Sequence, residues 1–575
     1  MKTITQHLTE KLSMAFLSCG YSSDLGLVKV SDRPDLCQFQ CNGAFTGAKL
    51  YKKSPVAIAQ EIASQLANDS EFKNINVVGA GFINLDLTDN FILSYTEKIL
   101  KDNDLGIPQS EKEETIFLDY GGPNVAKPLH IGHLRSAIIG ESLKRLAKAT
   151  GRKTISDVHL GDWGLQIGLV IAEIEERYQD ENSEVVITAN ELNEIYPFAS
   201  KKSKENDDFK IKAQSVTAEL QKGNPKYVSL WKEIMKVSIE DIKANYKLLN
   251  VDFDLWYGES DAENFINELI NLLNKEGLLE ESLGALVVNI SEPTDKTTLP
   301  PVIIKKSNDS NIYATTDLAT LIMRQKYFCP NEIWYVVDSR QSLHFTQVFR
   351  CAKKARIVPE TTELLHLGFG TMNGSDGKPY KTRDGGVMKL SDFYNTVYNA
   401  VYSRVSTSTF SEGANKKDIA EKITVATIKF GDLINHRLKD YIFDLDKFIA
   451  SEGKTGSFLL YTIARINSIL NKTCYKAQSS FTANSIYTDI ERELLIKLAL
   501  SNEAFINAYN EKAPNIICEN AYQLASAFSR FYNENHIISE KDIIKKSAWL
   551  SLCVATKTML QKHLDILGIE PVELM

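Results

Sequence analysis

The sequence predicts an α/β protein whose central domain is a doubly wound, parallel-sheet (Rossmann-like) fold, between an N-terminal α+β domain and a C-terminal all-α helix bundle. Strand and helix patterns alternate from Thr115 to Glu176, which is typical of a parallel sheet. A glycine turn separates the first of these strands from its helix. After residue 450 the apolar residues recur at helical spacing. We expect four parts, namely an α+β domain (1–110), the doubly wound domain with insertions (111–390), a helical junction (391–450) and the helix bundle (451–575).

Composition excludes few functions. The chain has 66 basic and 74 acidic residues and a net charge of −8, so no global basic signal indicates nucleic acid, although a local basic face would suffice. Eight scattered cysteines without a Cys-x-x-Cys pair indicate reduced thiols, and we expect no zinc site. No export signal and no uncharged run of about 20 residues is evident, so we expect a cytoplasmic protein with no membrane contact.

The N-terminal part reads as a helix (3–18), short strands, a second helix (55–67) and a last strand that ends at residue 87. In that strand Phe82 and Asn84 face the side opposite to the apolar residues. An exposed aromatic ring and amide can stack on and hydrogen-bond an unstacked base. The alternative is a polar sheet edge without a ligand.

The strand Thr115–Tyr120 leads through a glycine turn into a helix that reaches Thr150. His130 and His133 are three residues apart on the first turn of this helix, so both imidazoles share one face. The unpaired N–H groups and the dipole at a helix N-terminus favour a phosphate there, and Gly132 allows close approach of a ligand. The alternative is a helix that carries two histidines by chance.

Further along, residues 177–225 turn polar and predict a surface insertion that is solvated rather than functional. The run 302–305 is expected to open the second half of the nucleotide fold. Tyr313 and Asp317 lie four residues apart at the start of a helix, where both can face one cavity. A carboxylate there suits a guanidinium, although a helix-capping carboxylate is the common alternative. Bundle helices are expected near 459–471, 487–500, 515–533 and 545–567.

His130-Ile-Gly-His133 is the signature of class I aminoacyl-tRNA synthetases and a few related nucleotidyltransferases, and the longer string 122–136 resembles arginyl-tRNA synthetases. The resemblance continues through most of the chain. It implies a ligase that uses ATP with Mg²⁺ to convert L-arginine into arginyl-adenylate and passes the arginyl group to the 3′ end of tRNA(Arg). It also implies a monomer, a D-loop contact by Phe82 and Asn84, and anticodon binding by the bundle; a dimerisation or purely structural bundle is the alternative.

The same resemblance assigns residues. It implies that ATP is bound by Pro123, Asn124, His130, Gly132, His133, His344 and Met372, and arginine by Asp119, Asn124, Tyr313, Asp317 and Gln341. The implied catalytic residues are His130, His133, Lys127, Lys381 and Arg383. The second class I signature, Lys-Met-Ser-Lys-Ser, is absent, and Tyr380-Lys-Thr-Arg383 stands in its place. Which of Lys127, Lys378, Lys381 and Arg383 meets the pyrophosphate stays open.

Two other hypotheses about the function remain. A nucleotidyltransferase that activates a small acid without RNA would keep the histidine signature, but it would leave the N-terminal domain and the bundle unexplained. A paralogue that only binds RNA would lose catalytic residues, whereas all the matched ones are present here. An editing domain is not needed, because a site that hydrogen-bonds a polar side chain rejects analogues lacking it by about 10⁴–10⁵.

Overall fold

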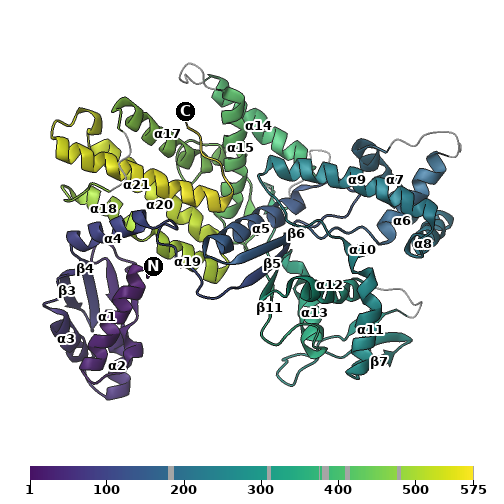
Figure 1. Ribbon diagram of the computed structural model, residues 1–575, viewed down its shortest axis with the longest axis horizontal. Helices are drawn as coiled ribbons and strands as arrows, with labels where there is room; N and C mark the ends of the chain where they lie inside the picture. Colours follow the sequence, from purple (N-terminus) through teal and green to yellow (C-terminus); the bar gives the residue numbers. More distant parts are fainter. Residues whose placement is uncertain are drawn as a thin grey trace.

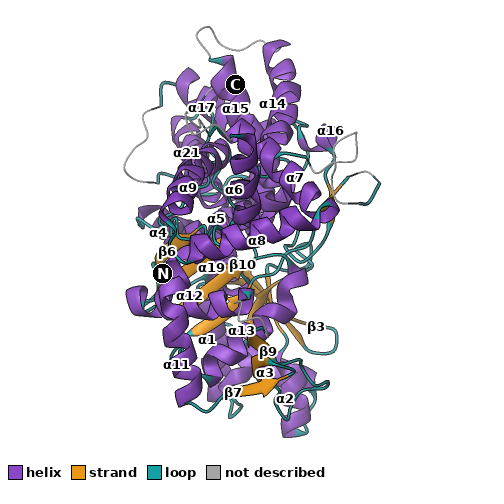
Figure 2. Ribbon diagram, turned by 90° about the vertical axis from the view of Figure 1, so that its right-hand side faces the viewer, coloured by secondary structure: helices purple, strands orange, loops and turns teal. Residues whose placement is uncertain are grey.

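The computed structural model describes residues 1–178, 187–306, 312–374, 376–378, 388–407, 415–475 and 481–573. Its fold class is the predicted one: a small α+β part, a central parallel sheet with helices, and a helical part (Figure 1). The α+β part lies below the bundle, and both lie to one side of the central sheet (Figure 1). Figure 2 shows the helical part as a layer above most of the strands.

The N-terminal sheet is antiparallel and has the strand order β1-β2-β4-β3. Helix α1 begins with a capping box in which Thr3 and Gln6 each satisfy a backbone N–H of the other. Helix α4 leaves this part and lies against the bundle, where Arg492 Nε donates to Asp89 Oδ1 at 2.7 Å. The elements are α1 (Ile4–Ser18), η1 (Ser23–Gly26), β1 (Val28–Val30), β2 (Phe39–Cys41), α2 (Gly43–Tyr51), α3 (Pro55–Leu66), β3 (Phe72–Val78), β4 (Phe82–Leu87) and α4 (Asp89–Lys101).

The central sheet contains four parallel strands in the order β11-β10-β5-β6. From β5 the chain passes through α5 to β6, which is the next strand toward one edge of the sheet. From β10 it passes through α13 to β11, which is the next strand toward the opposite edge. The strand order therefore reverses between β5 and β10, and ligands in such folds bind outside the carboxyl ends of the strands at this switch point. The elements are β5 (Thr115–Tyr120), α5 (Ile131–Ala149), β6 (Lys153–Asp157), α6 (Leu165–Arg177), α12 (Tyr313–Phe328), β10 (Glu332–Val336), η3 (Ser339–Gln341), α13 (Ser342–Lys354) and β11 (Glu363–His366).

The expectation that 302–305 opens the second half of the nucleotide fold is wrong. These residues form β9 (Val302–Lys305), the edge of an antiparallel sheet with β7 (Leu279–Ser282) and β8 (Ala285–Val288). Exposed and buried residues alternate along β9, whereas β5 is almost entirely buried. Strands of a covered parallel sheet are buried on both faces, so this alternation is the physical reason for the difference.

The predicted surface insertion contains a folded pair of helices, α7 (Ala189–Glu205) and α8 (Asp207–Gln221), followed by α9 (Pro225–Leu248). Its charges lie outside and form ion pairs, such as Lys202 Nζ with Glu173 at 3.0 Å. Its apolar residues are buried against α6 and its neighbours; they include Leu192, Ile195, Ala199, Phe209 and Ala213. The prediction was therefore right about the surface charge and incomplete about the core.

The bundle contains the four predicted helices and a fifth, α19, which the sequence did not indicate. Ser, Asn and Glu open α19, and Ser and Asn have low helix propensity, yet Phe505 and Tyr509 bury its inner face. Among the described residues, no helix is both long and apolar enough to cross a membrane. The remaining elements are α10 (Glu259–Ala262), η2 (Glu263–Phe265), α11 (Ile266–Lys275), β12 (Met372–Asn373), α14 (Leu390–Thr407), α15 (Lys416–Leu433), β13 (Tyr441–Ile442), α16 (Leu445–Phe448), α17 (Gly456–Lys472), α18 (Asp489–Ala499), α19 (Ser501–Glu511), α20 (Asn515–Glu534), η4 (Ile537–Ser539) and α21 (Ile543–Leu567).

Candidate active site

The two signature histidines lie at the N-terminus of α5, as predicted. His130 is the N-cap residue, and its Nδ1 accepts a hydrogen bond from Gly132 N at 3.0 Å. His133 Nδ1 accepts from His130 N at 3.2 Å, and the two ring centroids are 4.0 Å apart. Because each Nδ1 is an acceptor, each neutral ring carries its hydrogen on Nε2. The helix start therefore offers two imidazole N–H donors to a ligand.

Both imidazoles are held neutral. Burial lowers the pKa of His130, and the nearby ammonium of Lys127 lowers it further. Burial, together with His130 and Lys127, lowers the pKa of His133 to about 3. The pair can therefore donate hydrogen bonds to a phosphate at neutral pH but adds no charge. Positive charge comes from Lys127, whose Nζ lies 5.7 Å from the ring centroid of Tyr196 on α7.

A row of polar side chains crosses the sheet near its carboxyl edge. Asp157 of β6 pairs with Asp119 of β5, which pairs with Tyr335 of β10. Arg324 of α12 is fully buried, and its Nη2 donates to Asp119 at 2.6 Å and to Asp157 at 2.9 Å. Burial raises the pKa of Asp119 despite this contact, whereas the His159 ring and Arg324 overcome burial at Asp157 and lower its pKa to about 2. The Arg324 guanidinium thus forms hydrogen-bonded ion pairs with two buried carboxylates.

The predicted guanidinium-binding residues lie at the start of α12. Tyr313 is its first residue and is 69% exposed, and Asp317 follows one turn later. The Asp317 carboxylate lies 2.5 Å from His344 Nε2 on α13. The capping alternative is excluded, since the N-cap residue of α12 is Ile312 and no side chain caps the helix. Asp317 therefore faces α13, whose N-cap residue is the exposed Gln341.

Glu259 also lies in this region, although no motif of the sequence indicated a role for it. Its N–H donates to Leu160 O at 3.0 Å, which fixes it beside the chain that follows β6. Burial raises the pKa of Glu259 to about 7, with Asp162 and Asp317 adding to the rise and His159 opposing it. The Asp317 carboxylate is thus close enough to act on the charge of Glu259. Only the fold reveals this, because the two carboxylates come from different crossovers of the chain.

The turn after β5 is fixed by contacts with the next crossover. Val125 N donates to Gly161 O at 3.0 Å, and Asn124 forms a parallel bridge with Gly161. A Cβ at Gly161 would lie 2.1 Å from Asn124 Oδ1, so any side chain there would displace the Asn124 amide. Pro123 is buried within this turn. The turn residues that the sequence assigned to ATP are therefore held rigidly beside the N-terminus of α5.

The cations predicted for the second signature are placed only in part. Lys381 and Arg383 lie outside the described residues. Lys378 is exposed, and its N–H donates to Asp376 Oδ1 at 3.1 Å. Met372, predicted to contact ATP, is 5% exposed on β12. Of the candidate cations, Lys127 is thus the one that the structure places beside the histidine pair.

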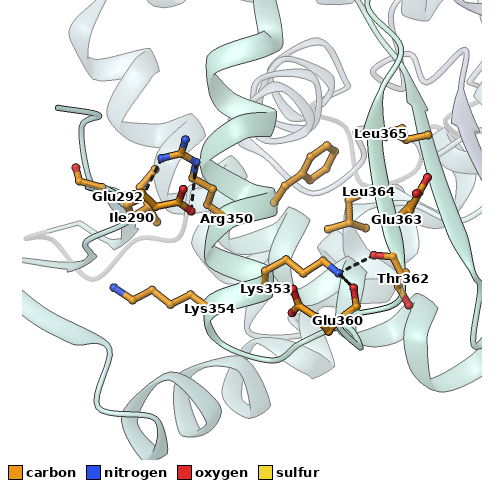
Figure 3. Close-up of a pocket in the computed structure, with 12 residues that line it drawn as sticks. Ile290, Glu292, Arg350, Lys353, Lys354, Glu360, Thr362, Glu363, Leu364 and Leu365 are labelled. Carbon is orange, nitrogen blue, oxygen red and sulfur yellow. Dashed lines mark hydrogen bonds and ion pairs between the residues drawn. The ribbon is translucent and has the colours of Figure 1, made fainter. Parts of the chain in front are cut away.

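A cavity of about 780 Å³ opens elsewhere, beside α13 and β11 (Figure 3). None of the predicted site residues lines it. Its basic side chains are engaged by the protein. Arg350 forms two bonds of 2.7 Å with Asp295, Lys353 donates to the carbonyl oxygens of Pro359, Glu360 and Thr362, and Lys354 donates to Asn289 O at 2.8 Å. This cavity therefore offers no free cation for a phosphate, and the site remains at the carboxyl edge of the sheet.

Comparison with known families decides between the readings left open by the sequence. Residues 95–445 match the family "tRNA synthetases class I (R), catalytic domain" and residues 459–575 match the "DALR anticodon binding domain". Residues 2–87 match the "Arginyl tRNA synthetase N terminal domain". An arginine–tRNA ligase of Alkaliphilus oremlandii is 45% identical, with 100% of both chains covered. This chain belongs to the arginyl-tRNA synthetases. The family consists of ligases that join arginine to tRNA.

Solved arginyl-tRNA synthetases share the fold along the whole chain. The Plasmodium falciparum enzyme superposes with a TM-score of 0.85 at 25% identity, and both chains are fully covered. The Thermus thermophilus enzyme superposes with a TM-score of 0.82 at 20% identity, again over 100% of each chain. The predicted fold, with its N-terminal part and its helical C-terminal part, is therefore confirmed.

In the region that matches the arginyl-tRNA synthetase N-terminal domain, Phe82 and Asn84 lie on an inner strand. The polar-edge alternative is excluded, because β1 and β3 are the edge strands of this sheet. Phe82 is half-buried and packs edge-on against Phe45, with ring centroids 4.8 Å apart. Asn84 is only 6% exposed, and its Oδ1 accepts from Gln40 Nε2 at 2.9 Å. The expected exposed amide is therefore mostly covered, and the D-loop contact stays a prediction.

Proposed function

We propose that this chain activates L-arginine with ATP and charges cognate tRNA(Arg). The arginine carboxylate attacks the α-phosphorus, pyrophosphate leaves, and arginyl-adenylate forms. A ribose hydroxyl at the tRNA 3′ end then attacks the arginyl carbonyl and AMP leaves. No protein nucleophile is required, so catalysis consists of positioning and charge stabilisation. The observation that carries the proposal is that α5 and α13 follow the adjacent parallel strands β5 and β10, so that His130, His133 and the Asp317–His344 contact lie on the carboxyl side of one sheet.

The N-terminus of α5 serves ATP in this proposal. His130 and His133 donate from Nε2 to phosphate and ribose oxygens, while Pro123, Asn124 and Gly132 shape the turn. His344 and Met372 complete the nucleotide site. Lys127, Lys381 and Arg383 neutralise the leaving pyrophosphate. ATP enters with Mg²⁺, which takes its ligands mainly from phosphate oxygens and water and adds positive charge there.

The arginine pocket is built around Asp317. A planar guanidinium can donate two parallel charge-assisted hydrogen bonds to a carboxylate, and Glu259, whose pKa burial raises to about 7, supplies a second negative charge once it ionises. Tyr313 and Gln341 border the same helix starts. Asp119 and Asn124 contact the remainder of the amino acid, with Asp119 oriented by Arg324. A neutral or anionic side chain would leave Asp317 and Glu259 without a cationic partner from the substrate, which supports selectivity for arginine.

The outer parts serve tRNA in the same proposal. The N-terminal domain (1–110) contacts the D-loop through Phe82 and Asn84, and the bundle (451–575) binds the anticodon. The catalytic domain (111–390) and the junction (391–450) lie between them. The enzyme acts as a cytoplasmic monomer.

Pyrophosphate exchange against all twenty amino acids, with and without tRNA, tests the proposal. Among the twenty amino acids, we expect only arginine to support exchange, and we expect this exchange only when cognate tRNA is present. Exchange that depends on another amino acid would refute the assigned substrate. Rapid exchange with arginine and ATP in the absence of tRNA would refute the tRNA requirement while leaving the substrate assignment intact.

A further inference from the structure

Arg135 belongs to the signature helix but has no role in the site described above. It follows His133 by two residues on α5 and is 2% exposed. Its Nε donates to Asp432 Oδ1 of α15 at 2.9 Å, and Asp432 is fully buried. Its Nη1 donates to Gly370 O at 2.6 Å and to Lys439 O at 3.2 Å. One side chain thus joins α5 to two distant segments of the chain, one at Gly370 and one that runs from Asp432 to Lys439.

The segments that Arg135 joins are also paired with each other. Met372 of β12 pairs in parallel with Tyr441 of β13, and Gly370 N donates to Arg437 O at 2.9 Å. A Cβ at Gly370 would lie 2.5 Å from Asp440 Oδ1, so the approach of the two chains requires glycine. The Arg135 guanidinium lies 5.2 Å from the Tyr441 ring, which closes the cluster. The strand that carries Met372 is therefore fixed to the helical junction and to α5 together.

The chain returns to the start of α5 at residues 388–390. Ile131 N donates to Met388 O at 3.1 Å, and Leu390 N donates to Leu129 O at 2.9 Å. His130 forms an antiparallel bridge with Lys389. The segments around Gly370 and around Met388 are consequently both attached to the start of α5, the earlier one through Arg135.

We infer that Arg135 is a positioning residue for adenylate formation, acting through Gly370 and Asp432 to hold the start of α5, the strand that carries Met372 and the helical junction in register. This inference rests on the proposed function. A guanidinium is suited to the task, because its planar fork can bind a carboxylate and carbonyl oxygens at fixed angles. Lysine keeps the charge but has no fork. Displacement of reacting groups by about 1 Å can lower a rate by about 10²-fold.

The test compares Arg135→Lys with Arg350→Lys. Arg350 also holds a carboxylate through two bonds of 2.7 Å in the same domain, but it lines the cavity of Figure 3 away from the site. Single-turnover adenylate formation is measured at saturating ATP, arginine and tRNA, and is normalised to active sites titrated in the same sample. Arginine KM, tRNA Kd and Tm are measured in parallel. We expect Arg135→Lys to lower the rate about 10- to 100-fold with unchanged arginine KM and tRNA Kd, and Arg350→Lys to leave the rate unchanged.

A merely structural role would lower Tm and the number of active sites, while the rate per active site stayed at the wild-type value; that result would overturn the inference. If Arg135→Lys does not fold, Asp432→Asn is measured instead. It keeps the shape of the partner and is expected to lower the rate per active site in the same direction, whereas a wild-type rate would overturn the inference. A wild-type enzyme without arginine-dependent exchange would defeat the proposed function instead, so the two failures are distinguishable.

Discussion

Replacing Asp317 with asparagine should weaken arginine binding far more than ATP binding. The carboxylate is 25% exposed and lies 2.5 Å from His344 Nε2, so its position is set by α13 as well as by α12. Asparagine keeps the size of the side chain and one acceptor oxygen. The substitution therefore removes the charge while disturbing the scaffold little.

The magnitude follows from the difference between the two kinds of hydrogen bond. A bond to a charged group contributes about 1.5–3 kcal/mol, whereas a neutral one contributes about 0.5–1.5 kcal/mol. The loss of about 1–1.5 kcal/mol corresponds to a rise of about 5- to 12-fold in the arginine Kd. Glu259 remains in Asp317→Asn and limits the loss, since it still supplies a negative charge in the pocket.

Steady-state KM values for arginine and ATP at saturating tRNA, with arginine Kd from calorimetry, measure the effect. Glu268→Gln is the matched control. Glu268 of α11 pairs at 2.6 Å with Lys326, which lies on an exposed face of α12, the helix that carries Asp317. The control should leave both KM values unchanged. An unchanged arginine KM together with a raised ATP KM in Asp317→Asn would refute the reasoning and assign Asp317 to the nucleotide.

Other substitutions test the remaining parts. His130→Ala and His133→Ala should each lower kcat for adenylate formation about 10²- to 10³-fold with nearly unchanged arginine binding, and wild-type single-turnover rates would show that the motif is structural. Because burial raises the pKa of Glu259 to about 7, this carboxyl group becomes charged as the pH rises through 7. The arginine Kd should therefore decrease between about pH 6 and pH 8. The same pH dependence of the arginine Kd in Glu259→Gln would contradict this prediction. Phe82→Ala should raise tRNA KM about 5- to 150-fold with normal kcat, and Asn84→Ala should raise it less. Early melting with unchanged tRNA KM would instead show that Phe82 only supports the core.

The sequence predicted the parts of the site that depend on neighbouring residues. His130 and His133 are three residues apart, so helical geometry alone places them together. The contact between Asp317 and His344 could not be predicted from spacing, because it depends on how α12 and α13 pack. Glu259 was missed for the same reason. Resemblance to a family assigned roles to Asp317 and His344, but it did not indicate that they touch each other.

Errors in the predicted fold have the same origin. A short apolar run such as 302–305 is compatible with a parallel or an antiparallel strand, and the choice depends on which neighbours cover its faces. Helix α19 was missed because low-propensity residues at its start are outweighed by burial of Phe505. Nothing in the sequence around Arg324 and Arg135 indicates burial, yet both are buried in ion pairs with partners from distant segments.

The neutrality of the two signature imidazoles affects how products leave. A cationic turn would attract pyrophosphate more strongly than ATP, because the released pyrophosphate carries its charge on a smaller body. The turn of α5 instead offers directed N–H groups without charge, and its share of the binding is therefore insensitive to ionic strength. In the proposed mechanism, retention of pyrophosphate then depends on cations such as Lys127, whose attraction added salt can screen. Turnover limited by pyrophosphate release would consequently speed up with moderate salt, even while the encounter with tRNA slows down.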